Sequence, residues 1–184
     1  EDNEALGAHD IEADGVTAGD VVVGLSASGG APYVLGALKK ARELGAIPLG
    51  ITCNPDSRMH PLCDVTIAPY VGPEVITGSS RLKAGTAQKL VLNMLSTGTM
   101  IKLGKVYGNL MVDVKPSNEK LIRRCVTIVC NATGCDDAPA TAALEACEYR
   151  PKTAIVMVLC GVSAEEAKAM LAKADGRVAK VLEK

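Results

Sequence analysis

Residues 20–26 read Asp20-Val-Val-Val-Gly-Leu-Ser26, a run of valines that ends in small polar residues. Continuous apolar runs of this length are typical of strands buried on both faces of a sheet. Residues 33–45 then carry apolar side chains at helical spacing, start after Pro32 and end at Gly45. Ile47–Cys53 is a second apolar run. A strand, a helix and a strand in this order predict a right-handed parallel unit. We therefore expect an α/β fold built on a doubly wound parallel sheet.

The flanking segments extend this prediction. The first twenty residues show no clear core face, whereas Val65–Val71 is a candidate third strand. Leu82–Val106 is typical of a long helix, apolar almost all round between Leu90 and Ile101. Such a helix must be covered on several sides, so we expect it to be mostly buried, partly in the core and partly against a second subunit. The sequence thus predicts a homodimer.

Shorter helices with recognisable starts and stops follow. Ser117 precedes Glu119 in a predicted first turn, Ser163 with Glu166 forms a capping box, and Gly134 is a plausible helix stop. We therefore expect two domains: residues 1–116, which hold the sheet, and residues 117–184, a small helical bundle.

Composition excludes several classes of protein. The 184 residues are 48% hydrophobic and 22% charged, with a net charge of -1, which argues against intrinsic disorder and against a highly charged nucleic-acid binder. Aromatic residues make up only 2%, all of them tyrosine, so base-stacking platforms are disfavoured. A globular protein with an aliphatic core and no nucleic-acid partner is expected.

The cysteines indicate a reducing compartment. There are seven, an odd number, with no CxxC pair. No basic-then-apolar signal segment opens the chain, and polar residues interrupt its longest apolar stretch, so we expect a cytoplasmic protein that does not insert into a membrane. Cys53, His60 and Cys63 are conceivable metal ligands, but a fourth is not evident and their spacing matches no zinc pattern, so no metal is expected.

The loop Ser26-Ala-Ser-Gly-Gly-Ala31 is predicted to bind phosphate. At a strand-to-helix turn, backbone N–H groups and the helix dipole favour an anion. We expect contacts from the hydroxyls of Ser26 and Ser28 and from the backbone of Gly29 and Gly30; the alternative is an ordinary turn. The loop lacks the lysine of an ATP-binding P-loop and the full dinucleotide fingerprint, so no cofactor is predicted. A serine hydrolase is also disfavoured, because residue 28 is serine where the G-x-S-x-G pattern requires glycine.

A second polar segment precedes the long helix. It reads Gly72-Pro-Glu-Val-Ile-Thr-Gly-Ser-Ser-Arg-Leu-Lys-Ala-Gly-Thr-Ala-Gln-Lys89 and concentrates charged and hydroxyl side chains at the start of that helix. Its expected substrate-binding residues are Glu74, Ser79, Ser80 and Lys83.

This segment closely resembles the signature shared by N-acetylmuramic acid 6-phosphate etherases and the glucokinase regulatory protein, which have the sugar isomerase fold. The resemblance continues through residues 90–114, which look like the bacterial etherase, and reaches the tail at Asn131-Ala-Thr-Gly134. It implies cleavage of the lactyl ether of N-acetylmuramic acid 6-phosphate to N-acetylglucosamine 6-phosphate and D-lactate, by elimination and then hydration, in cell-wall amino sugar recycling. Its partner would be a phosphorylated amino sugar, with no cofactor.

The resemblance assigns a catalytic role to Glu1, which matches one of the family's two catalytic glutamates. The other glutamate, the early strands and a first phosphate loop precede the matching residues, so the chain looks like the C-terminal part of an etherase whose sheet is incomplete at its N-terminus. Alone it is expected to be nearly inactive. The family's Arg-Thr pair is replaced by Gly30 and Ala31, which removes one cation and one hydroxyl.

Two other functions remain open. The shared signature also fits a non-catalytic regulator that binds a sugar phosphate. An aldose–ketose isomerase would share the fold and the enolisation step but would leave the lactyl ether intact.

Overall fold

The computed structural model describes residues 1–183 and divides into two compact units between Leu95 and Ser96. The domain boundary expected at residue 116 stays a prediction.

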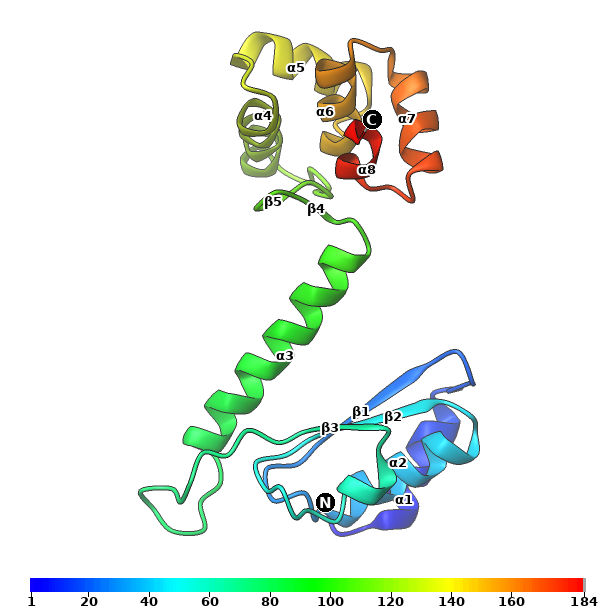
Figure 1. Ribbon diagram of the computed structural model, residues 1–184, viewed down its shortest axis with the longest axis vertical. Helices are drawn as coiled ribbons and strands as arrows, with labels where there is room; N and C mark the ends of the chain where they lie inside the picture. Colours follow the sequence, from blue (N-terminus) through cyan, green and yellow to red (C-terminus); the bar gives the residue numbers. More distant parts are fainter. Residues whose placement is uncertain (184) are drawn as a thin grey trace. The chain divides into compact units, whose positions relative to one another are not determined.

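The first unit is built on a parallel three-stranded sheet (Figure 1). Its strands are β1 (Val21–Leu25), β2 (Ile47–Ile51) and β3 (Val65–Ile67), in the order β1-β2-β3. Helix α2 (Pro32–Glu43) connects β1 to β2, whose residues pair in register from Val21 with Ile47 to Leu25 with Ile51. The predicted strand-helix-strand unit and the α/β class are confirmed, although β3 is shorter than the apolar run at residues 65–71.

Helix α2 packs closely on the sheet because β1 contains a glycine. A Cβ atom on Gly24 would lie 2.8 Å from the side chains of both Leu38 and Val34. Leu35 and Leu38 are fully buried together with Met59, which precedes the short 3-10 helix η1 (His60–Leu62). The absence of a side chain at residue 24 thus sets the distance between helix and sheet.

The other face of the sheet is exposed. Val21 is 53% exposed, Val23 40% and Val65 54%, so the prediction that β1 is buried on both faces is wrong for the described residues. Successive side chains of a strand point to opposite faces, and helices α2 and α1 (Glu4–Ala13) lie on one of them (Figure 1). The valine run therefore indicated the strand correctly but not its cover.

Helix α1 (Glu4–Ala13) was not predicted. Its contact with α2 relies on small residues: a Cβ atom on Gly7 would lie 2.0 Å from the carbonyl oxygen of Tyr33, and one on Gly36 would lie 2.0 Å from that of Glu4. Asn3 caps the helix by accepting a hydrogen bond from the Leu6 N–H at 3.0 Å. Because the two backbones touch, α1 needs no stripe of large apolar residues.

Helix α3 (Lys83–Lys102) has the predicted position but not the predicted burial. Only Ala84 is buried, whereas Leu90 is 51% exposed, Met94 70% and Ile101 51%. The single chain therefore does not bury residues 90–101 by itself, and the burial expected against a second subunit stays a prediction. An apolar composition indicates that burial of the helix surface would be energetically favourable, but it does not identify the segment or subunit that would bury it.

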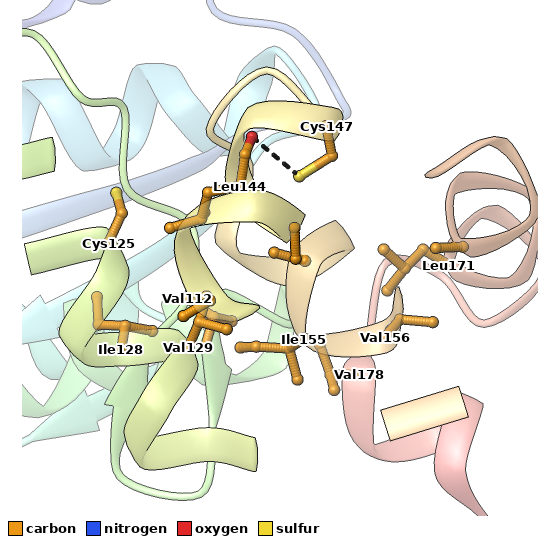
Figure 2. Packing of buried hydrophobic residues seen from close by; sticks show 14 residues of the cluster. Val112, Cys125, Ile128, Val129, Leu144, Cys147, Ile155, Val156, Leu171 and Val178 are labelled. Carbon is orange, nitrogen blue, oxygen red and sulfur yellow. Dashed lines mark hydrogen bonds between the residues drawn. The ribbon is translucent and has the colours of Figure 1, made fainter. Parts of the chain in front are cut away.

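The second unit is a short hairpin followed by a helical bundle (Figure 1). The elements are β4 (Val106–Tyr107), β5 (Leu110–Met111), α4 (Glu119–Thr133), α5 (Asp137–Ala146), α6 (Pro151–Cys160), α7 (Ala164–Lys173) and α8 (Val178–Leu182). Helix α6 contributes Ile155 and Val156 to the aliphatic core, where both are fully buried (Figure 2). The capping box of Ser163 and Glu166 is confirmed, and Gly134 ends α4 in a left-handed conformation. Asn118, rather than the predicted Ser117, caps α4.

Candidate functional site

The loop of residues 26–31 lies between β1 and α2, as predicted, at the carboxyl end of the sheet. It is organised by its own hydrogen bonds, because the Gly29 N–H donates to the carbonyl oxygen of Ser26 at 3.0 Å and to its Oγ at 3.1 Å. Gly29 has a φ of 69°, and a Cβ atom there would lie 2.2 Å from the Cβ of Ser57. Only glycine fits this position without displacing the loop.

Residues that follow β2 hold the same loop from beside it. Thr52 Oγ1 donates to the carbonyl oxygen of Ala27 at 3.2 Å, and Asn54 Nδ2 donates to that of Ser28 at 3.3 Å. Neither Thr52 nor Asn54 is among the site residues predicted from the sequence. A signal was available, because polar residues that follow adjacent parallel strands meet at one edge of the sheet, where ligands of α/β folds bind.

Two cavities open beside the loop and share Ala27, Ser28, Gly78 and Ser80 as lining residues. The larger, of 540 Å³, is also lined by Glu1, Ser26 and Tyr33. The smaller, of 230 Å³, is also lined by Cys53, Asn54 and Glu74. The structure therefore brings together five of the predicted site residues: Glu1, Ser26, Ser28, Glu74 and Ser80.

The other predicted site residues do not line these two cavities. The N–H of Gly29 is occupied by Ser26, and the Gly30 N–H donates to Ser28 Oγ at 3.4 Å. Ser79 and Lys83 are also missing from both linings, although they flank residues that are present. Three of the predicted serines, Ser26, Ser28 and Ser80, thus line the larger cavity, whereas Gly29 and Gly30 do not.

Glu74 has a well-defined structural role. Its carboxylate accepts hydrogen bonds from the backbone N–H groups of Leu82 at 3.1 Å, Lys83 at 3.0 Å and Ala84 at 3.1 Å. The bond from the Lys83 N–H is the main cause that lowers the pKa of Glu74 below its ordinary value, and the Lys83 ammonium adds to the effect. Because these N–H groups form the N-terminus of α3, Glu74 caps this helix and closes the loop at residues 74–82.

Tyr33 connects Glu1 to the rest of the site. Its backbone N–H donates to the carbonyl oxygen of Glu1 at 3.0 Å, and its hydroxyl donates to Asp10 Oδ2 at 2.7 Å. The hydrogen bond to Asp10 raises the pKa of the Tyr33 hydroxyl above its ordinary value. The chain segment before α1 is thereby held at the cavity.

The cysteine in the smaller cavity is not an activated nucleophile. Burial raises the pKa of the Cys53 thiol, and the charge of Glu74 raises it further, so the thiol is protonated at neutral pH. Within residues 1–183 there is no group of three or more histidine, cysteine, aspartate or glutamate residues arranged to hold a metal ion. None of the helices in that part of the chain is both long enough and apolar enough to cross a membrane.

Curated relatives share most of the sequence of this chain. It is 54% identical over 182 residues to a protein of Aliivibrio fischeri (strain MJ11), 57% identical over 182 residues to one of Klebsiella aerogenes, and 58% identical over 184 residues to one of Escherichia coli O157:H7 (strain EC4115 / EHEC). All three are named N-acetylmuramic acid 6-phosphate etherase. These matches cover 99–100% of this chain but only 61–62% of each relative, so the chain spans about three fifths of their length.

A family model also matches the first unit. Residues 5–98, slightly more than half of the chain, match the SIS domain. This range contains the sheet, the loop of residues 26–31 and every candidate site residue except Glu1. The parallel α/β architecture observed here agrees with that match, and the chain belongs to the SIS domain family.

Proposed function

We propose that this chain forms part of an N-acetylmuramic acid 6-phosphate etherase. The observation that carries the proposal is one cavity, at the carboxyl end of the parallel sheet, lined by a carboxylate residue and by hydroxyl residues: Glu1, Ser26, Ser28 and Ser80. The names of the relatives support the same reaction, cleavage of a lactyl ether from a phosphorylated amino sugar.

The reaction asks for acid–base chemistry on an opened sugar. Ring opening exposes an aldehyde, which acidifies the proton on the adjacent carbon. One carboxylate removes this proton, a carboxylic acid protonates the departing lactate oxygen, and water then adds to the unsaturated aldehyde. In this proposal Glu1 supplies one of the two carboxyl groups.

The phosphate end of the substrate would lie against the loop at residues 26–31. Ser26, Ser28 and Ser80 line the cavity and would donate from their hydroxyls, and the N-terminus of α2 adds its dipole. Binding of the phosphate, which does not react, would position the reacting carbons near Glu1. Glu74 serves a different purpose, because its carboxylate already holds the start of α3.

The decisive experiment measures D-lactate release from N-acetylmuramic acid 6-phosphate. We would join the chain to the part of the Klebsiella aerogenes relative that it does not match and assay the fusion beside the 184-residue chain. Glu1→Gln should abolish lactate release by the fusion, whereas Glu145→Gln on the exposed surface of the second unit should leave it unchanged.

Two results would contradict the etherase reaction itself, and a third would contradict only the assigned role of Glu1. Full activity of the Glu1→Gln fusion would remove the role of Glu1. Tight binding of the sugar phosphate without lactate release would indicate a regulator, and a ketose product that keeps its lactyl ether would indicate an isomerase.

The remaining expectations concern assembly and compartment. We propose a homodimer that uses the exposed apolar side chains of α3, among them Leu90 and Met94. A cytoplasmic location is supported by the seven cysteines, all of which are free thiols in the described chain.

A further inference from the structure

The second unit contains a cavity that the proposed function does not use. It has a volume of 490 Å³ and lies between residues 112–116, which follow β5, and residues 148–153, which lead into α6. Every residue that lines it comes after residue 98, outside the segment that matches the SIS domain. Its size falls in the usual range of small-molecule sites.

The N-terminus of α6 faces this cavity without a cap from the protein. Pro151 occupies the first helical position, and the side chain of the N-cap residue Arg150 makes no capping bond with the described residues. Among those residues, the backbone N–H groups of Lys152 and Thr153 also find no acceptor. Both N–H groups are therefore available to an anion, which the helix dipole favours at this end.

Thr153 provides an independent sign of a ligand. The residue is only 4% exposed and lines the cavity, yet its hydroxyl forms no hydrogen bond with any residue in 1–183. This hydroxyl is not one of the fully enclosed unpaired side-chain atoms of the described residues, so the small exposed part of Thr153 includes its hydroxyl, at the cavity. An acceptor bound in the cavity would satisfy this hydroxyl.

The charges around the cavity favour a negative ligand. Lys152, whose side chain is 16% exposed, lies 3.6 Å from Asp113 Oδ2, and Lys105 forms an ion pair with the same oxygen. Burial alone would raise the pKa of Asp113, but the two ammonium groups lower it, so the carboxylate is charged. Two cations thus share one anion, and Lys115, a further lining residue, has no ion pair among the described residues. The remaining charged lining residues, Arg150 and Glu148, pair with each other at 3.7 Å.

We propose that this cavity binds a phosphate group, either as inorganic phosphate or as a phosphorylated monosaccharide. The N–H groups of Lys152 and Thr153, the Thr153 hydroxyl and the Lys152 ammonium are its donors. Adjacent donors at a helix N-terminus suit the tetrahedral oxygens of phosphate, and the volume leaves room for a sugar ring. The site is separate from the loop at residues 26–31.

The test follows the backbone amides of the isotope-labelled 184-residue chain by NMR during titration with inorganic phosphate, N-acetylglucosamine 6-phosphate and unphosphorylated N-acetylglucosamine. Saturable shifts of the Lys152 and Thr153 amides are expected with the first two only. Equal affinities would identify free phosphate as the sufficient ligand, and tighter binding of the sugar phosphate would identify the monosaccharide ester; both results support the site.

Variants separate this site from the first unit. Thr153→Val and Lys152→Met should each weaken the affinity about tenfold or more. Thr153→Ser, which keeps the hydroxyl, and Lys120→Met, at an exposed position of α4, should not. Ser28→Ala should change only shifts in the first unit. The proposal is overturned if neither phosphate compound shifts these two amides saturably at millimolar concentration, if Thr153→Val binds as the parent chain does, or if the unphosphorylated sugar causes the same shifts.

Discussion

The backbone of Gly7 rests directly on the backbone of Tyr33: a Cβ atom on Gly7 would lie 2.0 Å from the Tyr33 carbonyl oxygen. Tyr33 in turn donates its N–H to the carbonyl oxygen of Glu1. The close crossing of α1 and α2 therefore determines where the proposed catalytic residue lies. A substitution at Gly7 should therefore displace Tyr33 and, through the hydrogen bond of Tyr33, also Glu1 at the cavity.

Gly7→Ala is expected to destabilise the first unit by about 1–3 kcal/mol, because the added methyl group cannot be accommodated without separating α1 from α2. Gly19→Ala is the matched control, since its Cβ atom would meet only Thr17 Oγ1 at 4.0 Å. Urea unfolding followed by circular dichroism, with amide exchange in α1, measures the difference. Equal stability of the two variants would show that the crossing is not tightly packed.

The two glycines of the loop at residues 26–31 should respond differently to alanine. Gly29→Ala combines a φ of 69° with a methyl group 2.2 Å from the Ser57 Cβ, so it should cost about 2 kcal/mol or more and disorder the loop. Gly30→Ala meets only Ser28 Oγ, at 3.9 Å, and should change stability by less than about 0.5 kcal/mol. Thermal unfolding and phosphate titration would check both, and a tolerated Gly29→Ala would contradict the described loop.

Gly30→Arg tests the departure from the etherase pattern. The space around Gly30 admits a side chain, and a guanidinium next to the loop would add one charge-assisted hydrogen bond to phosphate. We expect affinity for N-acetylglucosamine 6-phosphate to rise about tenfold, which calorimetry would measure. Gly30→Gln is the uncharged control. If it binds the sugar phosphate as tightly as Gly30→Arg does, the positive charge is not the cause of the increased affinity.

Much of the site could be predicted from sequence because its signals are local. A valine run, a Gly/Ser loop and a proline-started helix specify a strand-to-helix turn, and this turn places Ser26 and Ser28 at the cavity. The function of Glu74 could not be predicted in the same way. The polar composition of the surrounding segment suggested that Glu74 contacts a ligand. Only the fold shows that backbone N–H groups eight to ten positions later donate hydrogen bonds to its carboxylate oxygens.

The existence of α1 and the burial of β1 and α3 could not be predicted, because they depend on packing against other segments, which a local sequence pattern does not contain. Helix α1 escaped prediction because glycine-mediated contact leaves no apolar stripe in the sequence. For β1 and α3 the sequence shows an apolar pattern, but Val21 and Val23 of β1 and Met94 of α3 are exposed. There the apolar pattern is clear, and the described chain provides no cover for it.

The exposed side chains of α3 lead to a prediction on assembly. Met94 is 70% exposed, so Met94→Lys should fold normally, but if two copies pair through α3 it should place a cation in their apolar contact. Sedimentation should then show weaker self-association by about tenfold or more. Met111→Lys, on β5 and 52% exposed, is the control. An unchanged dimer in the Met94 variant would exclude this helix face as the interface.

Glu74 and the first turn of α3 should form a pH-dependent contact. The pKa of Glu74 is lowered by the N–H bonds of Lys83, Ala84 and Leu82, so the folded state favours its charged form. A carboxylate with a lowered pKa stabilises the fold above its unfolded pKa, here near the ordinary value of 4.5, and this stabilisation is lost as the pH falls through the lower, folded value. The contact should thus be intact at neutral pH and released in acid.

Glu74→Gln should remove this acid-side transition. The amide keeps one acceptor oxygen but not the charge, so the N–H groups of Leu82, Lys83 and Ala84 lose part of their bonding at every pH. NMR shifts of these three amides, followed from neutral pH to below pH 4.5, should move in the parent chain and stay nearly constant in Glu74→Gln. Glu145→Gln, exposed in the second unit, should leave the transition in place. If the Glu74→Gln amides titrate as the parent amides do, another group controls the start of α3, and the lining of the smaller cavity does not depend on this carboxylate.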